Sequence, residues 1–317
     1  AFASAILVYG MALTYAGTGT TEILEIGRQL HSNPYSHNTL VYIGMALMFC
    51  GLGFKVSLVP FHSWTPDVYQ GAPTPITGFM SVATKAAAFA LIARIFYISL
   101  TELQEIWMPF LFGVSVVTML VGNIAAIFQD DVKRMLAYSG VAHAGYLLIG
   151  IVANSANGVA SIIFYLGVYL FMNIGAFAVV YMVEGEGKES NSIFRFKGLA
   201  KRQPVMAACM SLFMLSLAGF PPTAGFFGKL FVFVAAVSQG YVLIAALAVV
   251  ASMIAVYFYL RIIVMMYFQE GNGEEMVSPS RGMTAIVTVS TVVILFVGFF
   301  PSSFMQLAAS SIPSLPH

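Results

Sequence analysis

Three lysines, Lys55, Lys85 and Lys229, lie within or beside long apolar runs of this chain. Placing a charge near the middle of a lipid bilayer costs about 2.5 kcal/mol or more, so such residues are rare without a role. An intramembrane lysine usually faces the protein interior or a water-filled cavity, where it can exchange protons. The pattern therefore points to the movement of protons or other ions across a membrane.

The composition is that of an all-α protein that crosses the bilayer many times. Of the 317 residues, 59% are hydrophobic and only 9% are charged, whereas a soluble domain carries about 25% charged residues. The net charge of +1 gives no indication of nucleic-acid binding. Cys50 and Cys209 stand alone, without metal-binding or disulfide spacing, and no glycine-rich nucleotide loop is recognised. We therefore expect no metal or cofactor site in this chain.

Nine apolar segments are long enough to span a membrane, and together they form a single transmembrane domain over residues 1–317. The chain starts without methionine, directly in an apolar run, which is typical of a piece cut within a helix. The segments lie at about 1–16, 39–59, 76–100, 107–128, 132–153, 158–183, 204–237, 241–268 and 284–309.

Two places interrupt this pattern. A helix over 204–237 would be about 50 Å long, against a hydrocarbon core of about 30 Å, and Pro221–Pro222 lie near its middle. We expect two half-helices that meet inside the membrane. The stretch 60–75 follows Lys55 and contains four prolines, so we expect an irregular segment, which must lie against protein or a water-filled cavity.

The charges of the loops predict the orientation. One side receives the loops near 60–75, 129–134, 184–203 and 269–283, and the other side has only Arg28 and Arg94 as basic residues. By the positive-inside rule the first side is cytoplasmic and the C-terminus at His317 lies outside. The eight basic residues of the first side are Lys133, Arg134, Lys188, Arg195, Lys197, Lys201, Arg202 and Arg281.

His143, near the centre of its apolar segment, joins the three lysines as a candidate, because histidine titrates near neutral pH. A structural role, as a snorkelling or hydrogen-bonded side chain, is the alternative for each of the four residues. All thirteen acidic residues map to loops or helix ends, with Asp67 as the deepest candidate. The lysines therefore either carry no charge for part of the time or pair with a carboxylate outside this sequence.

Three long strings of the sequence resemble one known family. They are GFKVSLVPFHSWTPDVYQGAP from Gly53, DVKRMLAYSGVAHAGY from Asp131 and LSLAGFPPTAGFFGK from Leu215. They are similar to the antiporter-like, proton-pumping subunits of NADH–quinone oxidoreductase (complex I). Within that family they are most similar to the bacterial N-type branch, the counterpart of mitochondrial subunit 2. The resemblance covers nearly the whole chain.

The resemblance implies a fold of fourteen helices with two inverted five-helix repeats, each with one helix broken in the membrane. Residues 1–100 would end the first repeat, 107–268 would form the second, and 284–309 would be the last helix. The nine segments would then be the last nine helices of an N-terminally truncated subunit.

The resemblance also implies a role for each candidate residue. The family's channel lysines on its seventh, eighth and twelfth helices fall on Lys55, Lys85 and Lys229, and its mid-helix histidine falls on His143. Lys55 would respond to a glutamate on the fifth helix, which is missing from this sequence. Lys85 and His143 would relay protons between half-channels, and Lys229 would be the terminal carrier.

The function implied is proton translocation, driven by electron transfer from NADH to quinone in other subunits of the complex. NADH, FMN, iron–sulfur clusters and quinone would bind in those partner subunits, and the membrane would be the bacterial plasma membrane. Two alternatives stay open. One is a subunit of a homologous cation/proton antiporter complex or membrane-bound hydrogenase, and the other is a passive membrane scaffold.

Overall fold

The computed structural model describes residues 2–32, 39–184, 191–271 and 281–312. Within these ranges the chain is helical, apart from turns and one isolated bridge between Asp131 and Ser192. The elements are α1 (Phe2–Thr18), α2 (Ile23–Ser32), α3 (Thr39–Val56), α4 (Trp64–Gly71), α5 (Thr74–Arg94), the π-helical turn η2 (Ile95–Ser99), the 3-10 turn η3 (Thr101–Leu103), α6 (Gln104–Ile127), α7 (Val132–Val152), α8 (Ala156–Val183), the 3-10 turn η4 (Ile193–Phe196), α9 (Leu199–Arg202), α10 (Pro204–Ala218), α11 (Ala224–Ser238), α12 (Val242–Phe268), α13 (Arg281–Phe299) and α14 (Pro301–Ser310).

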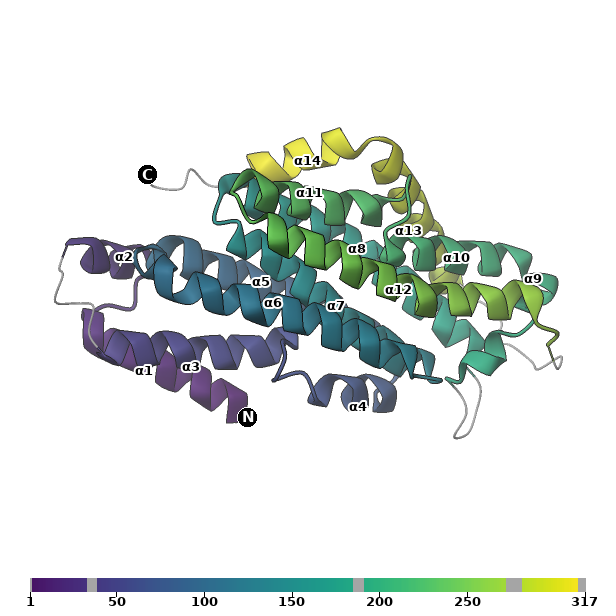
Figure 1. Ribbon diagram of the computed structural model, residues 1–317. Coiled ribbons are helices and arrows are strands. Elements are labelled where there is room, and N and C mark those ends of the chain that lie inside the picture. The colour runs from purple at the N-terminus through teal and green to yellow at the C-terminus, as the bar shows by residue number, and fades with distance from the viewer. Residues whose placement is uncertain (1, 33–38, 185–190, 272–280, 313–317) are drawn as a thin grey trace.

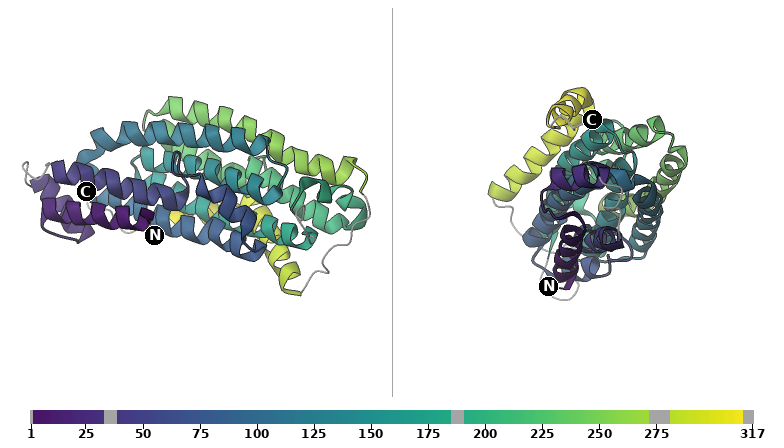
Figure 2. Two further views of the ribbon diagram at one scale, coloured as in Figure 1. Left: turned by 90° about the horizontal axis from the view of Figure 1, so that it is seen from below. Right: turned by 90° about the vertical axis from the view of Figure 1, so that its left-hand side faces the viewer.

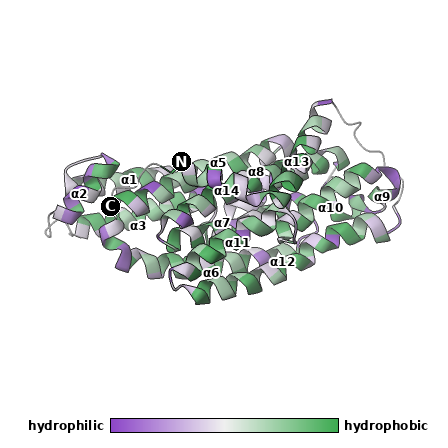
Figure 3. Cartoon of the chain, turned by 90° about the horizontal axis from the view of Figure 1, so that it is seen from above, coloured by the Kyte–Doolittle hydropathy of each residue, from purple (hydrophilic) through white to green (hydrophobic). Residues whose placement is uncertain are grey.

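The helices form an elongated bundle with two polar ends. α2 lies at one end and α9 at the other, with the N-terminal helices together near the α2 end (Figures 1 and 2). Hydrophilic residues gather at these two ends, whereas the length between them is mostly apolar (Figure 3). Large side chains such as Phe79 and Met253 are 63% and 69% exposed on the outside. An exposed apolar surface of this extent is that of an integral membrane protein, whose solvent is lipid.

Most of the predicted segments coincide with single helices. Within the described residues, seven helices are long and apolar enough to cross a membrane, and the bent pair of α1 and α2 makes an eighth. The remaining predicted segment, 204–237, is occupied by the two short apolar helices α10 and α11. Lys188 and His317, which entered the orientation argument, lie outside the described residues.

α7 is the central helix of the bundle. It contacts α4, α5, α6, α8, α11 and α12, and all of its residues except Arg134 and Tyr138 are buried. Such burial follows from its composition, because small and apolar residues cover all of its faces. The carboxylate of Asp131 caps its N-terminus by accepting a hydrogen bond of 2.8 Å from the Arg134 amide. Polar side chains on α7 are therefore held away from lipid on every side.

The break after α3 is shorter than we predicted from the sequence. Irregular backbone covers residues 57–63 and 72–73, and residues 64–71 between them form α4. A helix is possible there because Pro66 falls in the first turn of α4, where a helix needs no amide hydrogen. The break is also internally hydrogen-bonded. Ser57 bonds the hydroxyl of Thr65 at 2.6 Å, and the Val59 amide donates to the Thr118 hydroxyl at 3.1 Å. These bonds satisfy polar groups that lipid could not.

The second break, between α10 and α11, confirms the prediction of two half-helices. α10 ends at Ala218 and is capped by Gly219, which has φ of 90°, a left-handed conformation that glycine adopts without strain. The amide of Gly225 at the start of α11 donates to the Ser216 hydroxyl at 3.0 Å. The two half-helices are thus tied to each other across Pro221–Pro222.

The last predicted segment, 284–309, is two helices rather than one. α13 ends at Phe299 and α14 starts at Pro301. Proline lacks the amide hydrogen that would continue the helix, and it forces the preceding residue out of the helical region. Phe300 accordingly has φ of −126° and ψ of 57°.

Candidate functional site

Lys85 lies deep in the bundle on α5, with only 1% of its surface exposed. Its amine donates a hydrogen bond to the backbone carbonyl of Gly140 on α7. The amine also lies 5.6 Å from the ring centroid of Tyr169 on α8. Gly140 makes this approach possible, because a Cβ atom at that position would lie 2.7 Å from the amine. The charged form of Lys85 is thus held by a carbonyl dipole and a ring face.

Lys229 is equally enclosed, on α11, with 5% of its surface exposed. Its amine donates to the carbonyl of Ala218 at 2.9 Å and lies 4.8 Å from the ring centroid of Tyr146. Ala218 is the last residue of α10, where the helix dipole ends in a partial negative charge. The break between the half-helices therefore supplies a stabilising partner for the buried amine.

His143 lies on α7 and is 2% exposed. Both of its ring nitrogens are engaged: Nδ1 bonds the hydroxyl of Tyr165 at 2.7 Å, and Nε2 bonds that of Tyr259 at 3.1 Å. Tyr259 also bonds the hydroxyl of Ser139, one helical turn from His143. The imidazole is therefore part of a buried network that can accept or pass a proton at either nitrogen.

Two tyrosines join the histidine to the lysines. The His143 ring lies 5.0 Å from the ring of Tyr169 and 5.9 Å from that of Tyr146, measured between centroids. These are the same two rings that face Lys85 and Lys229. The structure thus brings together three of the four predicted residues in the order Lys85, Tyr169, His143, Tyr146, Lys229, which we call the buried relay.

The fourth candidate, Lys55, is not part of the buried relay. It lies in the last turn of α3, beside the break, and its side chain is exposed on the surface of the described structure. No hydrogen bond or ion pair joins it to another residue in the described ranges. The side chain of Lys55 is therefore accessible to a partner residue from outside the described structure, at the C-terminal end of α3.

Sequence reasoning overlooked the tyrosines and Ser139. A weak signal existed, because Ser139, His143 and Tyr146 are spaced by four and three residues and so share one face of α7. Tyr165 and Tyr169 are likewise one turn apart on α8.

Sequence reasoning was also wrong about Lys133, which it counted as a loop residue. Lys133 lies in the first turn of α7 and is 2% exposed, with its amine 3.8 Å from a carboxylate oxygen of Glu184. Asp67 was expected to be the deepest acidic residue, yet its side chain is 71% exposed and forms an ion pair with Arg134.

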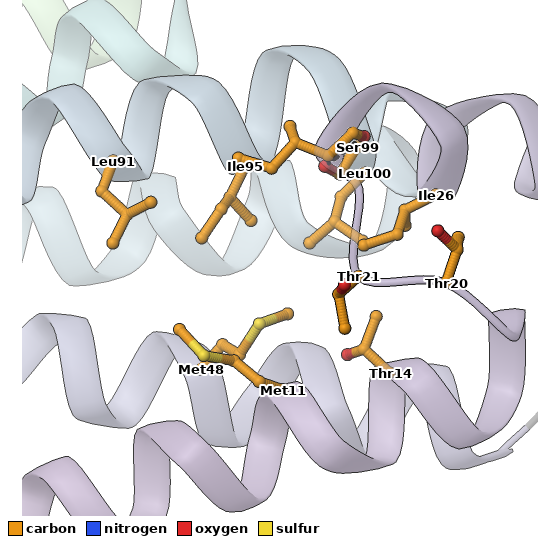
Figure 4. A pocket seen from close by; sticks show the side chains of 11 residues that line it. Met11, Thr14, Thr20, Thr21, Ile26, Met48, Leu91, Ile95, Ser99 and Leu100 are labelled. Atoms are coloured by element: carbon orange, nitrogen blue, oxygen red, sulfur yellow. Dashed lines mark hydrogen bonds between the residues drawn. The ribbon is translucent and has the colours of Figure 1, made fainter.

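A mainly apolar cavity of about 220 Å³ lies near the α2 end (Figure 4). The described residues that line it include no charged side chain. Its wall includes Thr14, Met48 and Leu100. Within the described ranges, no group of three or more His, Cys, Asp or Glu residues is arranged to hold a metal ion. The buried lysines and histidine of the described ranges are Lys85, Lys133, His143 and Lys229, which lie in the buried relay and at the start of α7.

Comparison with known sequences identifies the family of membrane proteins to which the chain is similar. Residues 1–255 match the family described as "NADH:quinone oxidoreductase/Mrp antiporter, TM". The chain is 44% identical, over 98% of its length, to the NADH-quinone oxidoreductase subunit N of Trichlorobacter lovleyi. It spans 64% of the length of that relative.

Solved structures share the fold. A chain of respiratory complex I from Thermus thermophilus superposes with a TM-score of 0.81 and 33% identity, covering 97% of this chain and 66% of that one. A chain of the Mrp complex from Dietzia sp. superposes with a TM-score of 0.85 and 25% identity, covering 98% and 65%.

Proposed function

Because the chain belongs to the NADH:quinone oxidoreductase/Mrp antiporter transmembrane family, we propose that it moves protons across the membrane as part of a larger NADH–quinone oxidoreductase. It is similar to subunit N of that enzyme in bacteria. NADH, FMN, iron–sulfur clusters and quinone would bind in partner subunits, and electron transfer there would drive the proton movement. The membrane would be the bacterial plasma membrane, with the end that carries α9 toward the cytoplasm and the C-terminus outside.

The buried relay is the observation that carries this proposal. Two amines and an imidazole, each 5% exposed or less, alternate with tyrosine rings inside the bundle. Each of the three can hold or release a proton, and like charges repel, so a proton on one site disfavours a proton on the next. A change of charge at one end of the relay would therefore move protons toward the other end.

The mechanism needs no bond-making between heavy atoms. Lys85 would pass a proton toward His143 by way of the tyrosine hydroxyls, and Lys229 would receive it and release it to the opposite side. The carbonyl of Ala218 favours the protonated form of Lys229 while the proton resides there. Lys55, on the surface, would respond to a carboxylate supplied by another part of the complex.

Sequence identity favours NADH–quinone oxidoreductase over a cation/proton antiporter. The fold does not separate them, since both kinds of solved chain superpose with TM-scores above 0.8. The identity of 44% with a subunit N, against 25% with the Mrp chain, supports the oxidoreductase.

Substitution of the two buried lysines tests the proposal. Lys85→Ala and Lys229→Ala, made in the full-length subunit within the assembled complex, should lower proton pumping per NADH oxidised several-fold, because a titrating group is lost. Alanine is well accepted in helices, so the complex should still assemble. Lys85→Arg and Lys229→Arg should also impair pumping, because arginine does not readily release its proton.

The exposed Lys201 provides the matched control, and Lys201→Ala should pump normally. Pumping would be measured in inverted membrane vesicles by quenching of a pH-sensitive dye, alongside NADH oxidation. Wild-type pumping by both arginine variants would refute the carrier role and favour a passive scaffold.

A further inference from the structure

A second buried cation lies outside the relay, at the end of the bundle that carries α9. The amine of Lys133 donates to the carbonyl of Ala72 at 2.7 Å and lies 3.8 Å from Oε1 of Glu184. The other carboxylate oxygen of Glu184 accepts a hydrogen bond of 2.6 Å from the hydroxyl of Thr74. A buried charge of this kind is costly, and the pairing compensates the cost.

The Lys133–Glu184 pair connects solvent with the protein interior. The side chain of Glu184 is 24% exposed, whereas that of Lys133 is 3% exposed. Glu184 follows the last residue of α8, and Lys133 points from the first turn of α7 toward the start of α5. A proton taken up from water by the carboxylate therefore has a buried amine beside it.

A stripe of buried hydroxyls leads from this pair to Lys85 along α5. Thr74, Thr77 and Ser81 precede Lys85 at spacings of three, four and four residues, so all four share one helical face. Each is 1% exposed or less. The α5 helix thus carries a continuous polar face from the pair to the relay.

α8 adds unsatisfied polar groups to the same region. α8 runs antiparallel to α5, with Glu184 at Thr74 and Tyr169 at Lys85, so Asn173 lies near the level of Ser81. The hydroxyl of Tyr169 and the side chain of Asn173 are buried and close enough to interact with each other, although neither the hydroxyl nor Oδ1 makes a hydrogen bond of good geometry. Buried polar atoms without a well-formed bond are groups that can exchange hydrogen bonds with a passing proton carrier such as water.

α7 presents small residues to the same region. Ala137 and Gly140 follow Lys133 by four and seven residues, on the same helical face as Lys133. Neither has a side chain larger than a methyl group, and Gly140 is the residue whose carbonyl the Lys85 amine reaches.

From these contacts we propose that Glu184 and Lys133 form the entry by which protons reach Lys85 from the end of the bundle that carries α9. This inference rests on the proposed function. The Glu184 carboxylate takes a proton from bulk water, and the Lys133 ammonium gives its proton inward. The hydroxyls between the two lysines each accept one proton and pass one on, so that the neutral amine of Lys85 gains the proton that Lys133 has lost. The proton on Glu184 then moves to the Lys133 amine, so the ion pair is restored and no other bond changes.

Three variants in the full-length subunit, assembled in the complex, test the chemical part of the proposal. Glu184→Gln keeps the side-chain size and the bond from Thr74 but cannot exchange a proton. Lys133→Arg keeps the positive charge but holds its proton. Both should lower pumping per NADH several-fold in inverted vesicles. Asp67→Asn is the control, because it removes the exposed ion pair with Arg134 at the same end, and it should pump normally.

A cysteine placed at Ser81 tests the route itself, independently of pumping. With Cys50 and Cys209 replaced by alanine, Ser81→Cys should react with a small cationic thiol reagent added to inverted vesicles. Ala88→Cys, buried on the same face of α5 but beyond Lys85, should react at least several-fold more slowly. Asn173→Cys provides a second probe at the level of Ser81 if the first variant does not assemble.

The outcomes separate this inference from the proposed function. Normal pumping by Lys133→Arg and Glu184→Gln, or equal reactivity of the probe and Ala88→Cys, would overturn the entry even if Lys85→Ala abolishes pumping. Normal pumping by the arginine variants of Lys85 and Lys229 would instead overturn the proposed function, whatever the cysteine at Ser81 does.

Discussion

The amine of Lys229 donates a hydrogen bond to the carbonyl of Ala218 across the break between two half-helices, at 2.9 Å. The two residues belong to different helices, α11 and α10, joined by the turn around Pro221–Pro222. The break therefore does more than shorten a helix that is too long for the membrane. It presents the negative end of a helix dipole to a lysine that has no ion pair within the described ranges. A proton on Lys229 is thus linked to the geometry of the break.

The first prediction concerns the space that Gly140 leaves for Lys85. A Cβ atom at Gly140 would lie 2.7 Å from the Lys85 amine and 3.1 Å from the Tyr169 hydroxyl. We expect Gly140→Ala to displace the amine and lower proton pumping several-fold, although alanine is by about 1 kcal/mol the better helix former. Gly113→Ala on α6, where a Cβ atom meets nothing within 4 Å, should pump normally. Equal pumping by the two variants would show that the position of the amine is unimportant.

The second prediction separates the ring of Tyr169 from its hydroxyl. Tyr169→Phe keeps the ring beside Lys85 and His143, so assembly should be unaffected. Because the hydroxyl is the group that would pass a proton between them, pumping should fall several-fold while NADH oxidation continues. Tyr257→Phe, at a site 60% exposed on α12, is the control and should behave as wild type. A hydroxyl of purely structural importance would instead reduce the amount of assembled complex, measured by native gel.

The third prediction concerns stability at the second break. A Cβ atom at Gly225 would lie 1.9 Å from the carbonyl oxygen of Ser216, and because this carbonyl is backbone, a side-chain rotation cannot relieve the clash. Gly225→Ala should therefore destabilise the subunit by about 3 kcal/mol, the upper range for overpacking. The loss would appear as a lower temperature of heat-induced aggregation for the solubilised complex. Gly71→Ala, which has open space, should leave that temperature unchanged.

The fourth prediction concerns orientation. Lys201 is exposed near the α9 end, where basic residues gather, and Glu105 is exposed at the start of α6. With Cys50 and Cys209 replaced, Lys201→Cys should react with a membrane-impermeant thiol reagent in inverted vesicles but not in intact cells from outside. Glu105→Cys should show the reverse. The opposite labelling of the pair would invert the topology that we propose.

Much of this arrangement follows from local signals. The depth of Lys85 and Lys229 follows from the length of the apolar runs around them, and the break at Pro221–Pro222 follows from helix length and proline chemistry. These signals need only neighbouring residues, so a single sequence contains them. The relay tyrosines could not be found in this way, because buried aromatic residues at helical spacing are indistinguishable from ordinary packing.

Lys133 and Pro66 show which features of the fold a single sequence leaves open. Lys133 follows Asp131 in a short polar stretch and therefore resembles a loop residue. Its burial depends on Ala72 and Glu184, which lie more than 50 residues away on either side. Pro66 stands in a stretch with four prolines, yet it fits the first turn of α4, because the register of the turn decides whether a missing amide matters.

The composition of the buried relay bears on which ion it can carry. Its described members offer amines, an imidazole and tyrosine hydroxyls, and no carboxylate is bonded to any of them. Sodium, a hard cation, prefers several oxygen ligands and would be repelled by protonated lysines. A proton differs because it binds covalently to the neutral amine, and the positive charge of the lysine is then the charge of the transported proton. We therefore expect transport through this bundle to be unchanged when external sodium is replaced by potassium. The relay would then select protons over metal cations by its chemistry, without the ring of ligands that forms a selectivity filter in an ion channel.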